Sequence, residues 1–224
     1  MFCSGFKSDM TGGKALALEQ RCAATGRQFT RFDYQGHGAS SGAFEEGTIG
    51  QWRADSLAVL DEVTYGPQVI VGSSMGSWIG LLLAVDRPEK VSGFLGIAPA
   101  VDFTQALLWP RMSEEARREI EENGVWYRHS VYEDGPYPIM KTLIEEGRNN
   151  LLLPGPIPFN GPVRLIHGMR DDAVPWSHSV YIAQGIESDD IEITFVKDGE
   201  HRLSRDSDLD RMINLLEDII GKVD

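Results

Sequence analysis

Residues 69–78 read VIVGSSMGSW, a run of β-branched residues that passes into the pattern Gly-x-Ser-x-Gly centred on Ser74. The apolar run 79–85 that follows has the composition of a buried helix. A strand that meets a helix through such a turn lifts the central serine out of the sheet, and the flanking glycines leave room where a Cβ atom would not fit. The helix N-terminus also leaves backbone N–H groups free to face negative charge. The segment predicts a nucleophilic Ser74, with Ser73 as a small packed neighbour.

Strand-like and helix-like segments alternate along the rest of the chain. Strands are predicted over 28–32, 91–97, 163–166 and 191–196, and helices over 48–63, from the serine turn to about 86, around 180, and over 208–220. Such alternation is typical of a mostly parallel sheet with helices on both faces. The rhythm breaks between about 102 and 152, where two helical segments are expected, over 113–123 and about 137–146. The sequence therefore predicts one α/β domain over 1–224 with a helical cap inserted at about 102–152.

The composition argues against several classes of partner and cofactor. The formal net charge of −13 at pH 7 disfavours nucleic acid and anionic membrane surfaces, because both attract clusters of lysine and arginine. The two cysteines, Cys3 and Cys22, form no C-x-x-C pattern and no Cys/His ligand spacing, so we expect no disulfide framework, no metal site and no cofactor. No apolar run approaches the roughly 18 residues of a membrane span, and no targeting segment is visible. We expect a bacterial-type, cytoplasmic protein without a membrane span.

A serine hydroxyl attacks a carbonyl carbon only when a base takes its proton, and that base is usually a histidine that a carboxylate orients. The loop after the predicted strand 163–166 reads HGMRDDAVP and offers such a carboxylate. Asp171 is the expected acid because it is the fifth residue of this H-G-x-x-D-x-x-V-P run, which resembles the acid loop of the α/β-hydrolase superfamily. Asp172 is the close competitor, and Asp102, just after the predicted strand 91–97, is a third candidate.

His201 is the expected base. It is the only histidine that follows the last predicted strand, 191–196, and it precedes the closing helix. His167, in contrast, is expected to have a structural place at a strand end. The chain order of serine, acid and histidine resembles that of the α/β-hydrolase superfamily. This resemblance predicts an α/β-hydrolase fold with the catalytic triad Ser74, Asp171 and His201.

Negative charge that develops on the reacting carbonyl oxygen needs backbone N–H donors. In this superfamily one donor follows the nucleophile, which selects the amide of Met75, and the other comes from the loop after an early strand, which selects Phe6 in the loop 4–8. Aromatic residues of the predicted cap, such as Trp109 and Trp126, are candidates for the wall of an acyl pocket. Packing of the cap onto the core explains these two residues equally well.

Several segments resemble a narrower family, that of alpha/beta hydrolase domain-containing protein 10. They are 10–17 (MTGGKALA), 31–34 (RFDY), 71–76 (VGSSMG), 87–91 (RPEKV), 124–126 (GVW) and 165–176 (LIHGMRDDAVPW). The resemblance extends from about residue 5 to 220. The family includes a mitochondrial serine hydrolase known as a palmitoyl-protein thioesterase and an acyl-glucuronide esterase. The resemblance implies the same triad and a substrate whose acyl group leaves a thiol or a sugar hydroxyl.

Together these residues predict a serine hydrolase that cleaves an acyl ester or thioester, on a small molecule or on an acylated protein, through an acyl-enzyme. Two alternatives stay open: a small peptidase or amidase with the same triad, and a catalytically idle α/β-hydrolase domain that serves as a binding protein. The chain begins about three residues before the oxyanion loop. We therefore expect the strands that precede this loop in the family to be missing, together with the family's mitochondrial presequence.

Overall fold

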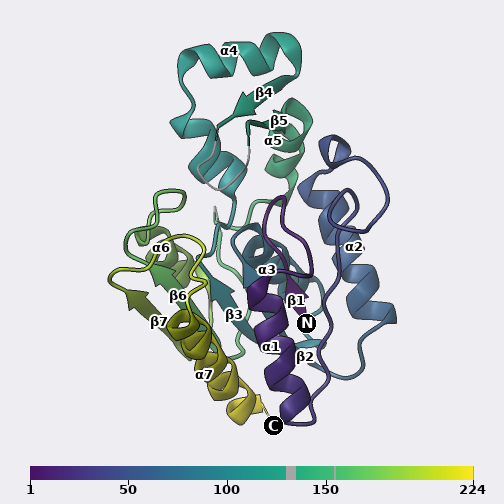
Figure 1. The fold of residues 1–224 in the computed structure, drawn as a ribbon, viewed down its shortest axis with the longest axis vertical. Helices are drawn as coiled ribbons and strands as arrows, with labels where there is room; N and C mark the ends of the chain where they lie inside the picture. Colours follow the sequence, from purple (N-terminus) through teal and green to yellow (C-terminus); the bar gives the residue numbers. More distant parts are fainter. Residues whose placement is uncertain (130–134, 154, 224) are drawn as a thin grey trace.

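The computed structural model describes residues 1–129, 135–153 and 155–223. Among these residues, the centre of the molecule is a five-stranded parallel sheet with the strand order β1-β2-β3-β6-β7 (Figure 1). The strands are β1 (Phe2–Cys3), β2 (Gln68–Ser73), β3 (Val91–Ile97), β6 (Val163–Gly168) and β7 (Ile191–Val196). The prediction of an α/β fold with a mostly parallel sheet is confirmed.

Helices cover both faces of the sheet. On one face lie α1 (Gly13–Ala24) and α7 (Asp206–Val223), and on the other lie α2 (Ile49–Glu62), α3 (Met75–Asp86) and α6 (Ser177–Gly185). Because neighbouring residues of a strand point to opposite faces, Ile70 of β2 packs in the cluster that contains α2 and α3, while Val71 packs against α1 and α7. The inner strands are largely buried on both faces, which explains consecutive apolar residues such as 70–71 in β2 and 94–95 in β3.

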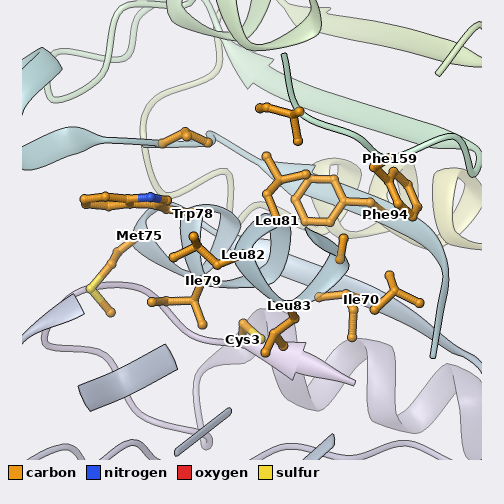
Figure 2. Close-up of a cluster of buried hydrophobic side chains, with 14 of the residues drawn as sticks. Cys3, Ile70, Met75, Trp78, Ile79, Leu81, Leu82, Leu83, Phe94 and Phe159 are labelled. Carbon is orange, nitrogen blue, oxygen red and sulfur yellow. The ribbon is translucent and has the colours of Figure 1, made fainter. Parts of the chain in front are cut away.

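Helix α3 forms the centre of the larger core cluster. All ten of its residues from Met75 to Ala84 are buried. Figure 2 shows Ile70 and Phe94 with six side chains of this helix: Met75, Trp78, Ile79, Leu81, Leu82 and Leu83. Trp78 is fully buried and its Nε1 donates to the Asn150 carbonyl at 2.9 Å. In the part of the chain that the structure describes, no helix is both long and apolar enough to cross a membrane.

The segment between β3 and β6 stands above the sheet at one end of the molecule (Figure 1). Its elements are two short turns of irregular helix (Thr104–Leu108 and Trp109–Arg111), α4 (Glu114–Asn123), β4 (Val125–Arg128), β5 (Tyr137–Met140), α5 (Lys141–Gly147) and the 3₁₀ turn Arg148–Asn150. As expected, Ser113 caps α4 by accepting from the Ala116 N–H at 3.1 Å, and Gly124 ends the helix at φ 76°. This segment has its own apolar cluster around Ile120 and Ile139.

Two expectations about secondary structure were wrong. Residues 137–140 were expected to begin a helix, but they form β5, which pairs antiparallel with β4. Tyr137 and Ile139 favour a strand, and the helix begins only at Lys141, beyond Pro138. The strand expected over 28–32 is reduced to one bridge between Arg31 and Phe2, because β1 pairs over only two residues.

Candidate active site

The predicted nucleophile lies on a strained turn between β2 and α3. Ser74 has φ 53° and ψ −119°, a backbone conformation that a residue with a side chain keeps only when its surroundings hold it there. Three backbone hydrogen bonds do so. The Ser74 N–H donates to the Ile97 carbonyl at 2.8 Å, and the Ser74 carbonyl accepts from Ser77 at 2.9 Å and from Ala100 at 3.1 Å.

Both glycines of the motif are required by close approaches of backbone. A Cβ atom on Gly72 would lie 2.5 Å from the Gly76 carbonyl oxygen and 2.5 Å from the Ser77 Cα. A Cβ atom on Gly76 would lie 2.0 Å from the Cys3 carbonyl oxygen, at the carboxyl end of β1. The motif therefore determines how closely β1, β2 and α3 converge at the serine.

Ser74, His201 and Asp171 lie on three loops that leave the carboxyl ends of β2, β7 and β6. His201 Nε2 is 3.1 Å from the Ser74 Oγ, and His201 Nδ1 is 2.6 Å from the Asp171 Oδ2. The Asp171 side chain is completely buried, and the His201 side chain is 18% exposed. This continuous hydrogen-bonded row has the geometry of a serine, its base and the carboxylate that orients the base.

The Asp171 carboxylate is held by four N–H donors. Its Oδ1 accepts from the backbone of Ala173 at 2.9 Å and of Val174 at 2.7 Å, and its Oδ2 accepts from His201 and from His167 at 3.1 Å. Burial raises the pKa of this carboxyl, but the hydrogen bonds from His167 and His201, the charge of His201 and the backbone N–H of Val174 together lower the pKa to about 2. Asp171 is therefore ionised at neutral pH and accepts a proton-bearing Nδ1.

The two competing carboxylates lie elsewhere. Asp172 is on the wall of the cavity in front of Ser74. Asp102 is buried, with φ 55°, and its carboxylate accepts from the backbone N–H groups of Leu152 (3.0 and 3.1 Å) and Leu153 (2.9 Å). Burial raises the pKa of Asp102. Asp102 thus joins the start of the segment above the sheet to its end.

The two predicted oxyanion donors flank the serine. Met75 is the first residue of α3, so its N–H has no partner within the helix, and both Phe6 and Met75 line the cavity beside Ser74. The loop with Phe6 is supported by a buried residue that sequence reasoning missed. His37 Nε2 accepts from the Lys7 N–H at 3.2 Å, and His37 Nδ1 lies 3.4 Å from the Gln35 carbonyl. Burial lowers the pKa of His37, which keeps the ring neutral and able to accept.

The cavity in front of Ser74 has a volume of about 420 Å³. Its apolar wall comes mainly from the segment above the sheet and includes Phe103, Leu107, Leu108, Met112, Trp126 and Val174. Trp126 therefore lies where a pocket residue was expected. Trp109 does not line this cavity among the described residues, and its indole ring instead packs against Arg117, whose guanidinium lies 5.4 Å from the ring centre.

The polar wall of the cavity is strongly cationic. Among the described residues that line it, one is a carboxylate, Asp172, and five are cationic: Lys7, Lys14, Arg111, Arg128 and Arg202. This bias is opposite to the net charge of −13 for the whole chain. Lys14 Nζ donates to the Arg202 carbonyl at 2.8 Å, and burial together with the nearby Arg202 charge lowers the pKa of Lys14 to about 8. The cavity thus combines an apolar wall with a positively charged one.

The parallel sheet, the serine on a strand-to-helix turn and the histidine and carboxylate on later loops define a hydrolase of the α/β-hydrolase fold. The family model described as Serine aminopeptidase, S33 (Hydrolase_4), matches residues 1–128. Palmitoyl-protein thioesterase ABHD10 from Pongo abelii is 42% identical over 224 residues, which cover 100% of this chain and 73% of that protein. The chain belongs to the ABHD10 family of α/β-hydrolases, and the predictions of the fold and of a hydrolase enzyme are confirmed.

Two solved structures agree with this assignment. A protein from Agrobacterium vitis S4 is 42% identical with a TM-score of 0.94, and the match covers 98% of this chain and 86% of that one. Mouse alpha/beta hydrolase domain-containing protein 10 is 41% identical with a TM-score of 0.93, and the match covers 100% of this chain and 89% of that one. The curated ABHD10 relatives carry the word mitochondrial in their names, whereas a cytoplasmic location of this chain stays a prediction.

Proposed function

We propose that the chain hydrolyses acyl esters or thioesters through an acyl-enzyme on Ser74. The observation that carries this proposal is the unbroken row of hydrogen bonds from Ser74 through His201 to Asp171 at the edge of a cavity of about 420 Å³. A buried, ionised carboxylate beside Nδ1 keeps the proton on that nitrogen and leaves Nε2 free to accept the serine proton.

The reaction proceeds in two halves. Ser74 Oγ attacks the acyl carbonyl carbon while His201 Nε2 takes the hydroxyl proton, and the N–H groups of Phe6 and Met75 donate to the oxyanion. The carbon–sulfur or carbon–oxygen bond to the leaving group then breaks, and His201 gives its proton to the sulfur or oxygen, which leaves as a thiol or alcohol. A water molecule then gives a proton to His201 and attacks the acyl carbon, the ester bond to Ser74 Oγ breaks, and His201 returns the proton to Ser74 as the carboxylic acid leaves.

The walls of the cavity indicate how a substrate lies. The apolar side around Phe103, Leu107 and Trp126 suits an acyl chain, and the cationic side suits a leaving group that carries negative charge. Relatives of the chain are named palmitoyl-protein thioesterases, and this name describes cleavage of a thioester between an acyl group and a protein. We assign the same reaction type to this chain, with a small-molecule ester or thioester or an acylated protein as substrate.

A second candidate reaction is amide cleavage. It is favoured by the description of the matching family model, Serine aminopeptidase, S33. The same nucleophile, base and oxyanion donors serve both reactions, and amides react more slowly because the amine leaves less readily than a thiol. Turnover of a matched series with one acyl group and a thioester, ester or amide link separates the two. Thioester or ester turnover at least tenfold above that of the amide supports the first proposal, and the reverse order supports the second.

The decisive experiment labels the purified protein with a fluorophosphonate and weighs the adduct by intact mass spectrometry. Wild type and Ser73→Ala are expected to gain one adduct, whereas Ser74→Ala gains none. Ser73 is the matched control because it is the adjacent serine and lines the same cavity. A folded wild type that is not labelled would contradict the proposal and favour a binding protein without catalysis.

A further inference from the structure

The Asp171 carboxylate receives hydrogen bonds from two imidazole rings. His201 Nδ1 lies 2.6 Å from Asp171 Oδ2, and His167 Nε2 lies 3.1 Å from the same oxygen. His167 is the fifth residue of β6 and its side chain is completely buried. Its Nδ1 lies 2.7 Å from the Oγ of Ser179, a buried residue of α6. A row of hydrogen bonds thus continues past the acid, through two side chains that the proposed reaction does not use.

The partners of His167 determine where its proton lies. Two oxygens face Nε2: Asp171 Oδ2, and the Val174 carbonyl oxygen at 3.0 Å. Both oxygens only accept hydrogen bonds, so Nε2 carries the proton. In the neutral ring Nδ1 then accepts, and Ser179 Oγ–H donates to it. The two acceptors at Nε2 thus set the tautomer in which His167 donates to the acid of the triad, and the hydrogen bond from Ser179 supports it.

We propose that His167, held by Ser179, is a positioning residue. It orients the Asp171 carboxylate toward His201 and limits how strongly this carboxylate stabilises the protonated form of the His201 ring. The proposal rests on the proposed function, in which His201 is the base. Each N–H that donates to a carboxylate disperses its negative charge. With His167 absent, Asp171 has three donors in place of four, and its full charge bears more strongly on the His201 ring.

The other charged groups near this row of hydrogen bonds are the same in wild type and in a protein that lacks the His167 side chain. His178 of α6 donates to the Val101 carbonyl at 2.8 Å, and burial, with the nearby His167, lowers its pKa. On the cavity side of His201 lie Asp172, Arg202 and Lys14. None of these residues provides the contacts from His167 to Asp171, so a change at His167 acts on His201 through the shared carboxylate.

The test compares pH profiles of kcat/KM, for a thioester substrate, between wild type and variants at His167 and Ser179. His167→Leu removes the donor and should move the acid limb upward by about half to one pH unit, since one charge-assisted hydrogen bond to the carboxylate is lost. His167→Gln keeps an N–H donor at a similar reach and should return the limb toward that of wild type. Ser179→Ala should give a smaller shift in the same direction, and His178→Gln, the matched buried histidine, should give none.

A second readout does not depend on turnover. The titration midpoint of the His201 ring, followed by NMR in histidine-labelled protein and assigned with His201→Ala, should move with the acid limb. A folded His167→Leu whose His201 midpoint stays within about 0.2 pH unit of that of wild type overturns the proposal, and Ser179→Ala decides in the same way where His167→Leu does not fold. Failure of the proposed function is seen separately, as absence of fluorophosphonate labelling in wild type.

Discussion

Replacing Gly76 by alanine places a methyl group where two backbone oxygens already lie. The new Cβ atom would be 2.0 Å from the Cys3 carbonyl oxygen and 2.5 Å from that of Ser4. Cβ atoms essentially never approach other atoms within 3.0 Å, so the Cys3 carbonyl must retreat by about 1 Å (3.0 − 2.0 = 1.0). Both neighbours are backbone atoms, so no rotation of a side chain relieves the contact.

That displacement reaches the proposed oxyanion donor within three residues. Cys3 and Ser4 lead directly to Gly5 and Phe6, and a misplacement of about 1 Å at a catalytic group costs on the order of a hundredfold in rate. Overpacking of a tight site also lowers stability by about 1–3 kcal/mol. Gly76→Ala should therefore lower kcat by about a hundredfold and the free energy of unfolding by about 1–3 kcal/mol.

Two other glycines are matched controls for this variant. A Cβ atom on Gly80, one turn further along α3, would meet only the side-chain atoms Ile70 Cγ2 at 2.8 Å and Phe94 Cε2 at 2.9 Å. Gly80→Ala should lower stability but keep most of kcat. Gly221 in α7 has open space around it, and Gly221→Ala should leave kcat unchanged and raise stability by up to about 1 kcal/mol.

Steady-state kinetics on a thioester and urea unfolding of all three variants provide the measurement. The reasoning is contradicted if Gly76→Ala keeps kcat within about threefold of wild type and Gly80→Ala loses as much kcat as Gly76→Ala or more. In that case the close approach of β1 to the serine turn does not position the loop with Phe6.

Asp102→Ala should lower the free energy of unfolding by about 1–3 kcal/mol, because two backbone N–H groups lose their buried acceptor. The variant should keep kcat within a few-fold of wild type. A loss of kcat above about a hundredfold would instead identify Asp102 as a catalytic acid. Folding lowers the pKa of Asp171 from 3.8 to about 2, so its stabilising effect is present above pH 3.8 and disappears as the pH falls through 2. The difference in unfolding free energy between wild type and Asp171→Asn should therefore shrink by roughly 2 kcal/mol from about pH 5 to about pH 2, and a constant difference in urea unfolding would contradict this. Lys14, with its pKa lowered to about 8, loses its charge above that pH, so KM for a substrate with an anionic leaving group should rise between about pH 7 and 9 in wild type but stay flat in Lys14→Arg.

Ser74 and Asp171 were predicted from short local patterns and His201 from its place after the last predicted strand, and the structure brings the three side chains together. Ser74 follows a β-branched strand and precedes an apolar helix, and Asp171 follows the next strand but one in the sheet. A parallel sheet places the carboxyl ends of its strands at one edge, so the order of elements alone brings these loops together. No sequence pattern states the distances, which depend on the twist of the sheet and on the packing of α3.

Residues that support the site were harder to find, because their partners are distant in the chain. His37 accepts from Lys7, 30 residues away, and nothing in the turn Gly36–Gly38 points to that loop. The role proposed for His167 involves Ser179, which belongs to a different element. The run H-G-x-x-D contains the signal for one of these contacts, since His167 and Asp171 are four residues apart and meet across the turn after β6.

Asp102, a candidate acid in the sequence, has a different place in the structure. It follows β3, and its backbone has a positive φ of 55°. In this protein the carboxylate instead binds the N–H groups of Leu152 and Leu153, where the segment above the sheet returns. Both ends of that segment are thereby joined at one buried point, while the residues between them form the apolar wall of the cavity. With Asp102 used in this way, the loop after β6 remains for the acid, and Asp171 there has the four N–H donors that keep a buried carboxylate ionised beside His201.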